Sequence, residues 1–182
     1  MNKLAIALSA ALALGASFSA SAQSGTITFN GEVTSTTCTI TWPGNGGETN
    51  DPVVILPTVP TTALAANGAT AGKQTVSLVI GGSAGLCTSG HAAIELNPSR
   101  NANQTNGYLN NTDAPIDGGA TNVQIGLRDA SDAAINLATP WRSAEIDLST
   151  TKQIDFAAEY RATDLAGAGT VTASVGYTID YK

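Results

Sequence analysis

The sequence predicts an all-β sandwich, and three observations support this. Short stretches in which apolar and polar residues alternate recur along the chain, and this two-residue period is typical of strands with one buried face. Gly, Pro and Asn residues separate these stretches, as they do at turns between strands. No segment carries the longer period of an amphipathic helix over several turns. Many short strands joined by turns are typical of a two-sheet sandwich.

The first 22 residues predict an export signal. Met1 to Lys3 give a short positive start, and Leu4 to Ala16 form an apolar run that is too short to span a bilayer. Ala20-Ser21-Ala22 then fits the small-x-small pattern of a signal peptidase site. We therefore expect residues 1–22 to be a signal peptide whose removal leaves residues 23–182. A membrane anchor is the alternative, but no later segment is apolar for long enough to cross a membrane, so the mature protein is not expected to be membrane-spanning.

The strands predicted after the signal peptide follow in chain order. The alternating or apolar stretches are residues 26–33, 37–42, 53–56, 74–80, 92–96, 121–129, 152–161 and 169–181. Residues 61–66 are predicted to form one or two helical turns that end at Asn67-Gly68. Residues 43–51 and 81–85 read as turns, and the Asn-rich residues 98–119 as a long, loosely structured surface stretch.

Composition indicates one domain with an unusually uncharged surface. Only 12% of the residues are charged, against about 25% in an average globular domain. Few charges and many small polar residues suit a protein that is largely covered by copies of itself. The net charge of −6, without a basic cluster, makes nucleic acid an improbable partner.

The two cysteines, Cys38 and Cys87, predict one disulfide. An even count in an exported chain favours pairing in an oxidising compartment. Closing a loop of this length contributes about 4 kcal/mol in the chain-entropy model. With a single His in the chain, the pair does not resemble a metal site, and we expect neither a metal nor a cofactor.

The two ends of the mature chain show the strongest alternation. Residues 169–181 alternate over a length that corresponds to about 40 Å of strand, far beyond the usual five or six residues. Residues 23–36, before the first cysteine, alternate in the same way. Each end can be read as an ordinary core strand, or the N-terminal one as a detachable strand used by another subunit; composition leaves both open.

The chain resembles the pilins of chaperone–usher fimbriae, of the type 1 kind. The resemblance rests on the signal peptide, the short arm Gly25 to Val33 before Cys38, the position of Cys87, and a C-terminal alternating strand that starts at Gly169 and carries a penultimate Tyr181. It covers essentially the whole chain. No single feature is specific, whereas their conjunction is.

The resemblance implies a fold and a mechanism. The fold would be an incomplete immunoglobulin-like β-sandwich, residues 37–182, completed by a donated strand. Residues 23–36 would be the N-terminal donor-strand extension. A periplasmic chaperone would first fill the open groove, and an outer-membrane usher would then exchange the chaperone strand for the arm of the next subunit, by β-strand addition. The partners would be other pilin subunits in a homopolymer, the chaperone and the usher, and the product a fimbrium on the cell surface that supports adhesion.

The resemblance also assigns residues. In the donor strand, Gly31 would be the small residue at which an incoming arm begins to displace the chaperone. The C-terminal carboxylate on Lys182 would be held by basic residues of the chaperone. The donor-strand residues are Ile27, Phe29, Gly31 and Val33, and the groove and chaperone-binding strand carries Gly169, Val171, Ala173, Val175, Tyr177, Ile179 and Tyr181.

Motifs that could indicate catalysis have little support in the sequence, and we expect no enzymatic activity. Residues 81–85 match the G-x-S-x-G pattern of serine hydrolases, but no helical pattern follows, and His91 comes too soon after Ser83 for the expected order. His91 alone makes no metal site, and the loop aspartates lack the spacing of a calcium loop. Trp42 and Trp141 are predicted to be packing residues, with an exposed sugar-binding pair as the alternative.

Two functions remain open at this point. The favoured function is a structural fimbrial subunit, and the alternative is a monomeric exported carbohydrate-binding β-sandwich module. A self-sufficient module would pair residues 23–36 within its own sheet and fold alone. A pilin would be unstable alone and would become stable when a peptide of residues 23–36 is added.

Overall fold

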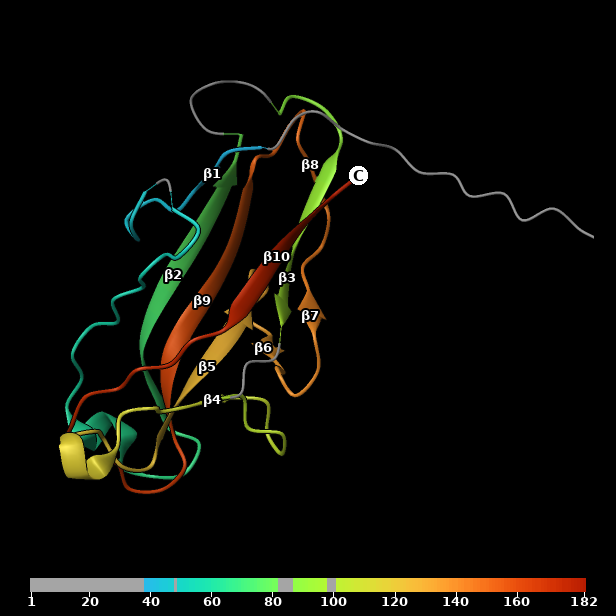
Figure 1. Cartoon of the computed structure of the whole chain (residues 1–182). Coiled ribbons are helices and arrows are strands. Elements are labelled where there is room, and N and C mark those ends of the chain that lie inside the picture. The colour runs from blue at the N-terminus through green and yellow to red at the C-terminus, as the bar shows by residue number, and fades with distance from the viewer. Residues whose placement is uncertain (1–37, 48, 82–86, 98–100) are drawn as a thin grey trace, which may run out of the picture. The chain divides into compact units, whose positions relative to one another are not determined.

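Two antiparallel sheets make up the part of the chain that the computed structural model describes, which is residues 38–182 apart from 48, 82–86 and 98–100 (Figure 1). All these residues belong to one unit, residues 35–182. The predicted signal peptide and the predicted arm lie outside the described residues.

The first sheet is built around two long strands, β2 (Thr70–Ile80) and β9 (Gln153–Ala162). Their inner residues face each other in register, with Val76 opposite Phe156 and Leu78 opposite Ile154. The strand order is β1–β2–β9–β5–β4, and β6 pairs with β5. The remaining strands of this sheet are β1 (Ile40–Thr41), β4 (Leu109–Asn110), β5 (Val123–Asp129) and β6 (Ala134–Ile135).

The second sheet is smaller and places the C-terminal strand at its edge. Strand β3 (His91–Asn97) lies at its centre and pairs with β10 (Gly176–Tyr181) from Gly176 opposite Asn97 to Tyr181 opposite Ala92. On the other side, β3 pairs with the short strands β7 (Trp141–Arg142) and β8 (Ile146–Asp147). Among the described strands, β3 is the only neighbour of β10, so one backbone edge of β10 is open.

The core lies between the two sheets. The alternation of each long strand turns its apolar residues inward, where β-branched and aliphatic side chains pack on the pleated surface. A second, smaller cluster surrounds Leu64 on the 3₁₀ turn η1 (Thr61–Leu64). The largest fully buried side chains are Trp42, Val76, Leu78, Ile80, Ile94, Leu96, Ile135 and Leu137.

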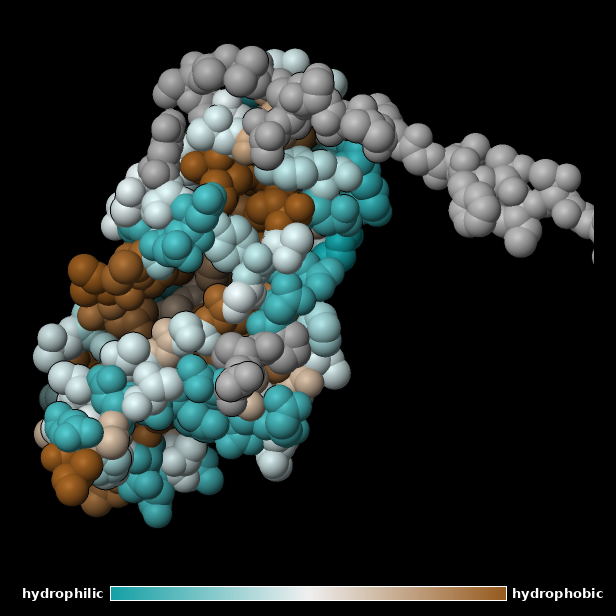
Figure 2. Space-filling view, viewed as in Figure 1, coloured by the Kyte–Doolittle hydropathy of each residue, from teal (hydrophilic) through white to brown (hydrophobic). Residues whose placement is uncertain are grey.

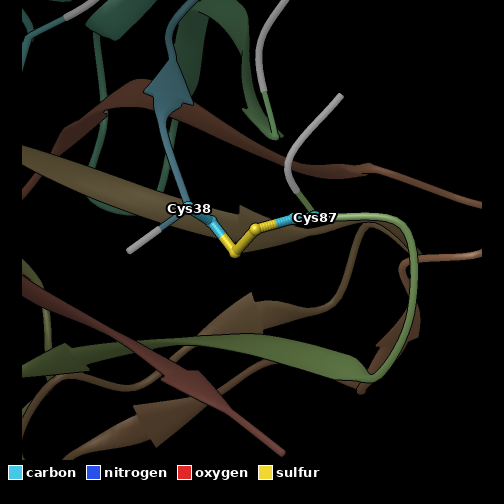
Figure 3. Close-up of a disulfide and its surroundings, with 2 residues drawn as sticks. All are labelled: Cys38 and Cys87. Carbon is cyan, nitrogen blue, oxygen red and sulfur yellow. A yellow bond between two sulfur atoms is a disulfide. The ribbon is translucent and has the colours of Figure 1, made fainter. Parts of the chain in front are cut away.

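A disulfide joins the two ends of the segment that precedes β3 (Figure 3). Cys38 stands just before β1, and Cys87 lies in the connection between β2 and β3. Their Cα atoms are 5.7 Å apart, within the usual range for a disulfide. The predicted pairing of Cys38 with Cys87 is confirmed.

Most of the predicted strands that fall on described residues match the structure, and the differences lie at residues 53–56, 98–119 and 169–181 and at the unpredicted short strands β6, β7 and β8. Residues 53–56 form no strand, because Val53 donates its N–H only to Asn45 O, at 3.2 Å, and residues 54–56 make no backbone hydrogen bond with described residues. The stretch 98–119, which was predicted to be loosely structured, contains β4 and the 3₁₀ turn η2 (Pro115–Asp117) within its described part, residues 101–119. The predicted strand 169–181 is hydrogen-bonded as a strand only over Gly176–Tyr181. In the described part of the chain, no helix is long and apolar enough to span a bilayer.

Candidate functional site

A long apolar groove opens between the C-terminal segment and an extended segment near the start of the domain. Its volume is about 1190 Å³. Figure 2 shows apolar surface around a hollow on the face of the domain drawn in Figure 1. The floor is made by core side chains of the first sheet and of β3: Val76, Leu96, Leu109, Ile125, Leu127, Phe156, Ala158 and Tyr160.

One wall of the groove is the extended segment 50–56. Its side chains alternate, because Val54 and Leu56 are half-buried against the core whereas Val53 and Ile55 are 70% and 80% exposed. The period of two is that of a strand, although the segment has no strand partner among the described residues. Side chains of this wall therefore alternate as they do in a strand, although the segment is not part of a described sheet.

The opposite wall is residues 171–181. The odd-numbered residues Val171, Ala173, Val175, Tyr177 and Ile179 are half-buried and pack against the core, whereas Thr172, Ser174 and Thr178 are exposed. The sixth residue of the alternating face, Tyr181, lines the groove but is 40% exposed. The structure thus places the predicted groove residues from Val171 to Tyr181 along this wall.

Both walls leave backbone groups without partners in the described part of the chain. Residues 54–59 and 173–175 form no backbone hydrogen bond with described residues. Strand β10 bonds only to β3 and turns its second edge to the groove. Unpaired edges of this kind are templates for another strand. The arrangement can accept one extended chain segment that satisfies both edges and fills the apolar floor.

Gly169 fixes the start of the C-terminal wall. The next residue, Thr170, donates its N–H to Gly118 O at 2.9 Å and accepts from Ala120 N at 2.8 Å. A Cβ atom on Gly169 would overlap the backbone of residues 118–120, and the φ of Gly169 is 158°. Gly169 is therefore required for this close backbone approach and does not itself line the groove.

The other end of the wall is held by backbone pairing and charge. Lys182 and His91 exchange both backbone hydrogen bonds, at 2.7 and 2.9 Å. Arg142 on β7 contacts Asp180 at 2.8 Å and Glu145 at 3.0 Å, and Lys182 Nζ also contacts Glu145. The ammonium of Lys182, followed by the guanidinium of Arg142, lowers the pKa of the Glu145 carboxyl. Because these groups are largely solvated, the network orients the end of β10 more than it stabilises the fold.

Three aromatic rings of the groove lining are in contact with one another. The Trp42 ring makes edge contacts with Phe156, at 6.4 Å between centroids, and with Tyr177, at 5.2 Å. The Tyr177 hydroxyl donates a hydrogen bond to Asn50 O at 2.8 Å. Burial raises the pKa of the Tyr177 phenol, so the hydroxyl keeps its proton and remains a donor at neutral pH.

Other residues that sequence reasoning singled out lie away from the groove or outside the described chain. His91 is the exposed first residue of β3. Most of the G-x-S-x-G stretch, and all of the predicted donor residues Ile27, Phe29, Gly31 and Val33, lie outside the described residues. No cluster of three potential metal ligands occurs among the residues that the structure describes.

Sequence reasoning missed the wall formed by residues 50–56. It identified 53–56 only as a short apolar run ending at Pro57. The run itself gave no sign of its position at an open edge, because the exposure of an edge depends on tertiary packing. Trp42 was predicted to be a packing residue, and its 2% exposure confirms this. Trp141 is half-buried on β7 and packs against the core cluster.

The fold and groove together define a class of protein: a β-sandwich with an unfilled position at the edge of its sheets. The chain matches the model of the family described as fimbrial protein over residues 27–182. It therefore belongs to the fimbrial protein family.

Relatives and a solved structure agree with this assignment. The chain is 35% identical to the major fimbrial subunit SMF-1 of Stenotrophomonas maltophilia (strain K279a), over 92% of this chain and 98% of that protein. It is 30% identical to the type-1 fimbrial protein A chain of Escherichia coli (strain K12), over 98% and 93% of the two chains. The crystal structure of the P pilus rod subunit PapA matches with a TM-score of 0.51 at 15% identity, over 86% of this chain and all of PapA (100%).

These findings confirm the predicted fold class and the predicted family. The domain is an all-β sandwich of the incomplete immunoglobulin-like kind found in pilins. The protein is a non-enzymatic structural subunit of a bacterial fimbria at the cell surface. Family membership displaces the alternative of a monomeric carbohydrate-binding module.

Proposed function

We propose that this subunit polymerises by donor-strand exchange, in which residues 23–36 of one copy occupy the groove of the next. The observation that carries the proposal is the apolar groove between two backbone edges, residues 54–59 and 173–175, that have no described partner. An inserted strand would bond to both edges and complete the sandwich, which is the physical basis of β-strand addition.

The sequence of the arm suits this groove. Ile27, Phe29 and Val33 would face the apolar floor, and the intervening polar residues would face solvent. Burial of three such side chains contributes roughly 5–9 kcal/mol, at about 1.5–3 kcal/mol each. Each ladder hydrogen bond adds about 1 kcal/mol. A junction between subunits is then stable without a covalent link.

An exposed apolar groove also needs a partner before polymerisation, because open edges promote aggregation. We assign this role to a periplasmic chaperone that lends a strand to the same groove, and the exchange step to an outer-membrane usher. Val171, Ala173, Val175, Tyr177, Ile179 and Tyr181 would form the wall that chaperone and arm both contact. Gly31 would be the position at which the incoming arm begins to displace the chaperone, and the C-terminal carboxylate of Lys182 would meet basic chaperone residues.

Complementation by peptide tests the open groove directly. The mature chain, residues 23–182, is refolded at low concentration with and without an excess of a peptide of residues 23–36. We expect the peptide to raise the thermal midpoint and to keep the chain monomeric in size-exclusion chromatography. A chain that is monomeric and equally stable without peptide would show that the sandwich completes itself and would refute the proposal.

Fibre assembly tests the arm itself. Phe29→Asp places a charge where an apolar floor is expected, so we expect cells producing this variant to lack fibres in electron microscopy. The chaperone complex should still form, because the groove of the variant subunit is unchanged. Thr28→Asp adds the same charge to the solvent face of the arm and serves as the control, with normal fibres expected. Normal fibres from Phe29→Asp would remove the pocket-filling role of this residue.

A further inference from the structure

One side chain crosses the groove and joins its two walls. Tyr177 belongs to β10 in the second sheet, and its hydroxyl donates to the backbone carbonyl of Asn50 on the opposite wall, at 2.8 Å. Both residues line the groove. An extended segment that pairs with both walls would have to pass between Asn50 and Tyr177.

The residue before Asn50 is held in place by a buried side chain. Trp42 follows β1, is 2% exposed, and donates its indole N–H to Thr49 O at 3.1 Å. The residue after this acceptor is Asn50. The Trp42 ring also packs edge-on against the Tyr177 ring. Trp42 thus positions both the acceptor carbonyl and the phenol that bonds to it.

We propose that Tyr177 is a latch that holds the empty groove closed at this end and regulates the entry of a strand. This inference rests on the proposed function, since it concerns the same groove and the same occupant, the arm of a second copy. The hydrogen bond from Tyr177 to Asn50 and the incoming backbone compete for the same space. The bond must therefore break before the strand can lie between the two walls.

The latch has a kinetic signature. It exists only in the empty groove, so removal of the hydroxyl should accelerate binding of the arm and leave its dissociation unchanged. One neutral hydrogen bond is worth about 1 kcal/mol, which corresponds to an increase of about fivefold in the association rate. The Tyr177 ring itself stays as part of the apolar wall.

The test uses the full mature chain with Phe29→Asp, so that copies do not fill one another's grooves. A fluorescent peptide of residues 23–36 is added in excess, and its association and dissociation are followed by anisotropy. Tyr177→Phe should associate about fivefold faster than the parent, with the same dissociation rate. Tyr108→Phe is the matched control, because Tyr108 does not line the groove and no hydrogen bond of its hydroxyl is found among the described residues. It should behave as the parent.

A second variant tests the same hydrogen bond without changing Tyr177, so that an effect of Tyr177→Phe on folding can be recognised. Trp42→Phe removes the indole N–H that holds Thr49 and should also accelerate association. Equal association rates for the parent and both variants, with the peptide still bound, would overturn the latch and leave the proposed function intact. Acceleration by Tyr108→Phe to the same extent would also overturn it. If the parent chain binds no peptide, both the proposed function and the latch are refuted.

Discussion

At the scale of single residues, the C-terminal wall depends on a glycine that contacts no ligand. Gly169 was predicted to belong to the groove strand, but the structure places it beside the backbone of residues 118–120, outside the groove lining. Its missing Cβ lets Thr170 form two backbone hydrogen bonds with that segment. Gly169 therefore affects the groove indirectly, because it fixes the position of the C-terminal wall, residues 171–181.

Gly169→Ala should destabilise the domain by about 1–3 kcal/mol, because the added methyl group overlaps backbone atoms that cannot move independently. Gly126→Ala on β5 is the control, since its Cβ would meet the nearest side chain, Tyr108, at an ordinary 3.5 Å. Urea unfolding of the mature chain with bound arm peptide measures both. Equal midpoints for the two variants would contradict the close backbone approach at Gly169.

At the scale of elements, one segment of the chain has two different environments. Residues 176–181 are a regular strand on β3, whereas residues 171–175 keep the same in-and-out alternation without a strand partner among the described residues. Among the described residues, the pairing of β3 with β10 ends at Asn97, opposite Gly176. The alternation of residues 171–175 thus reflects contact with the core floor on one face. Thr172 bonds through its backbone to Asn111 and Thr112, whereas residues 173–175 have no described backbone partner and can pair with a donated strand.

Alternation along this segment predicts opposite effects for neighbouring residues. Ala173→Asp puts a carboxylate against the apolar floor, so we expect arm-peptide affinity to fall by roughly 100-fold or more. Ser174→Asp, one residue further on, adds the same charge to an exposed side chain and should change affinity little. Titration of each variant with labelled peptide gives the two constants. Similar losses for both variants would show that residues 171–175 do not present one face to the donor.

The long strands could be predicted from the sequence, whereas the two-residue strands could not. β2, β5 and β9 were predictable because their period of two extends over several residues, and the end of β3 at Asn97 was placed within one residue. β6, β7 and β8 were not, since two residues such as Trp141 and Arg142 carry no period. The wall at residues 50–56 and the bond from Tyr177 to Asn50 arise from tertiary packing, which no local pattern encodes.

At the scale of the whole molecule, two sheets enclose a core that reaches the surface along the groove. The Cys38–Cys87 disulfide ties the start of the first sheet to the connection that enters β3. In the chain-entropy model such a loop closure contributes about 4 kcal/mol. It secures the domain beside the groove, where the unfilled sheet supplies fewer contacts than a complete sandwich would.

Four surface carboxylates predict a loss of stability in acid. A hydrogen bond from the Ser131 hydroxyl lowers the pKa of Asp129, and one from the Ser149 hydroxyl lowers that of Asp147. The Lys73 ammonium lowers the pKa of Asp132. With Glu145, each of these groups releases its proton more readily in the folded than in the unfolded chain. Their stabilisation is therefore present above pH of about 4 to 4.5, the ordinary range of these groups, and is lost as the pH falls through the lower folded values.

Urea midpoints of the peptide-bound mature chain should accordingly be similar at pH 7 and pH 6 and decrease from pH 4 to pH 2. The ionic contributions of Asp132 and Glu145 are solvent-exposed, so 1 M salt should weaken their share. The contributions of Asp129 and Asp147 depend on short hydrogen bonds to Ser131 and Ser149 and should persist in salt. Asp129→Asn removes the charge that the Ser131 hydroxyl favours and should reduce the acid-dependent loss. A midpoint that stays constant from pH 4 to pH 2 would contradict this role of the four carboxylates.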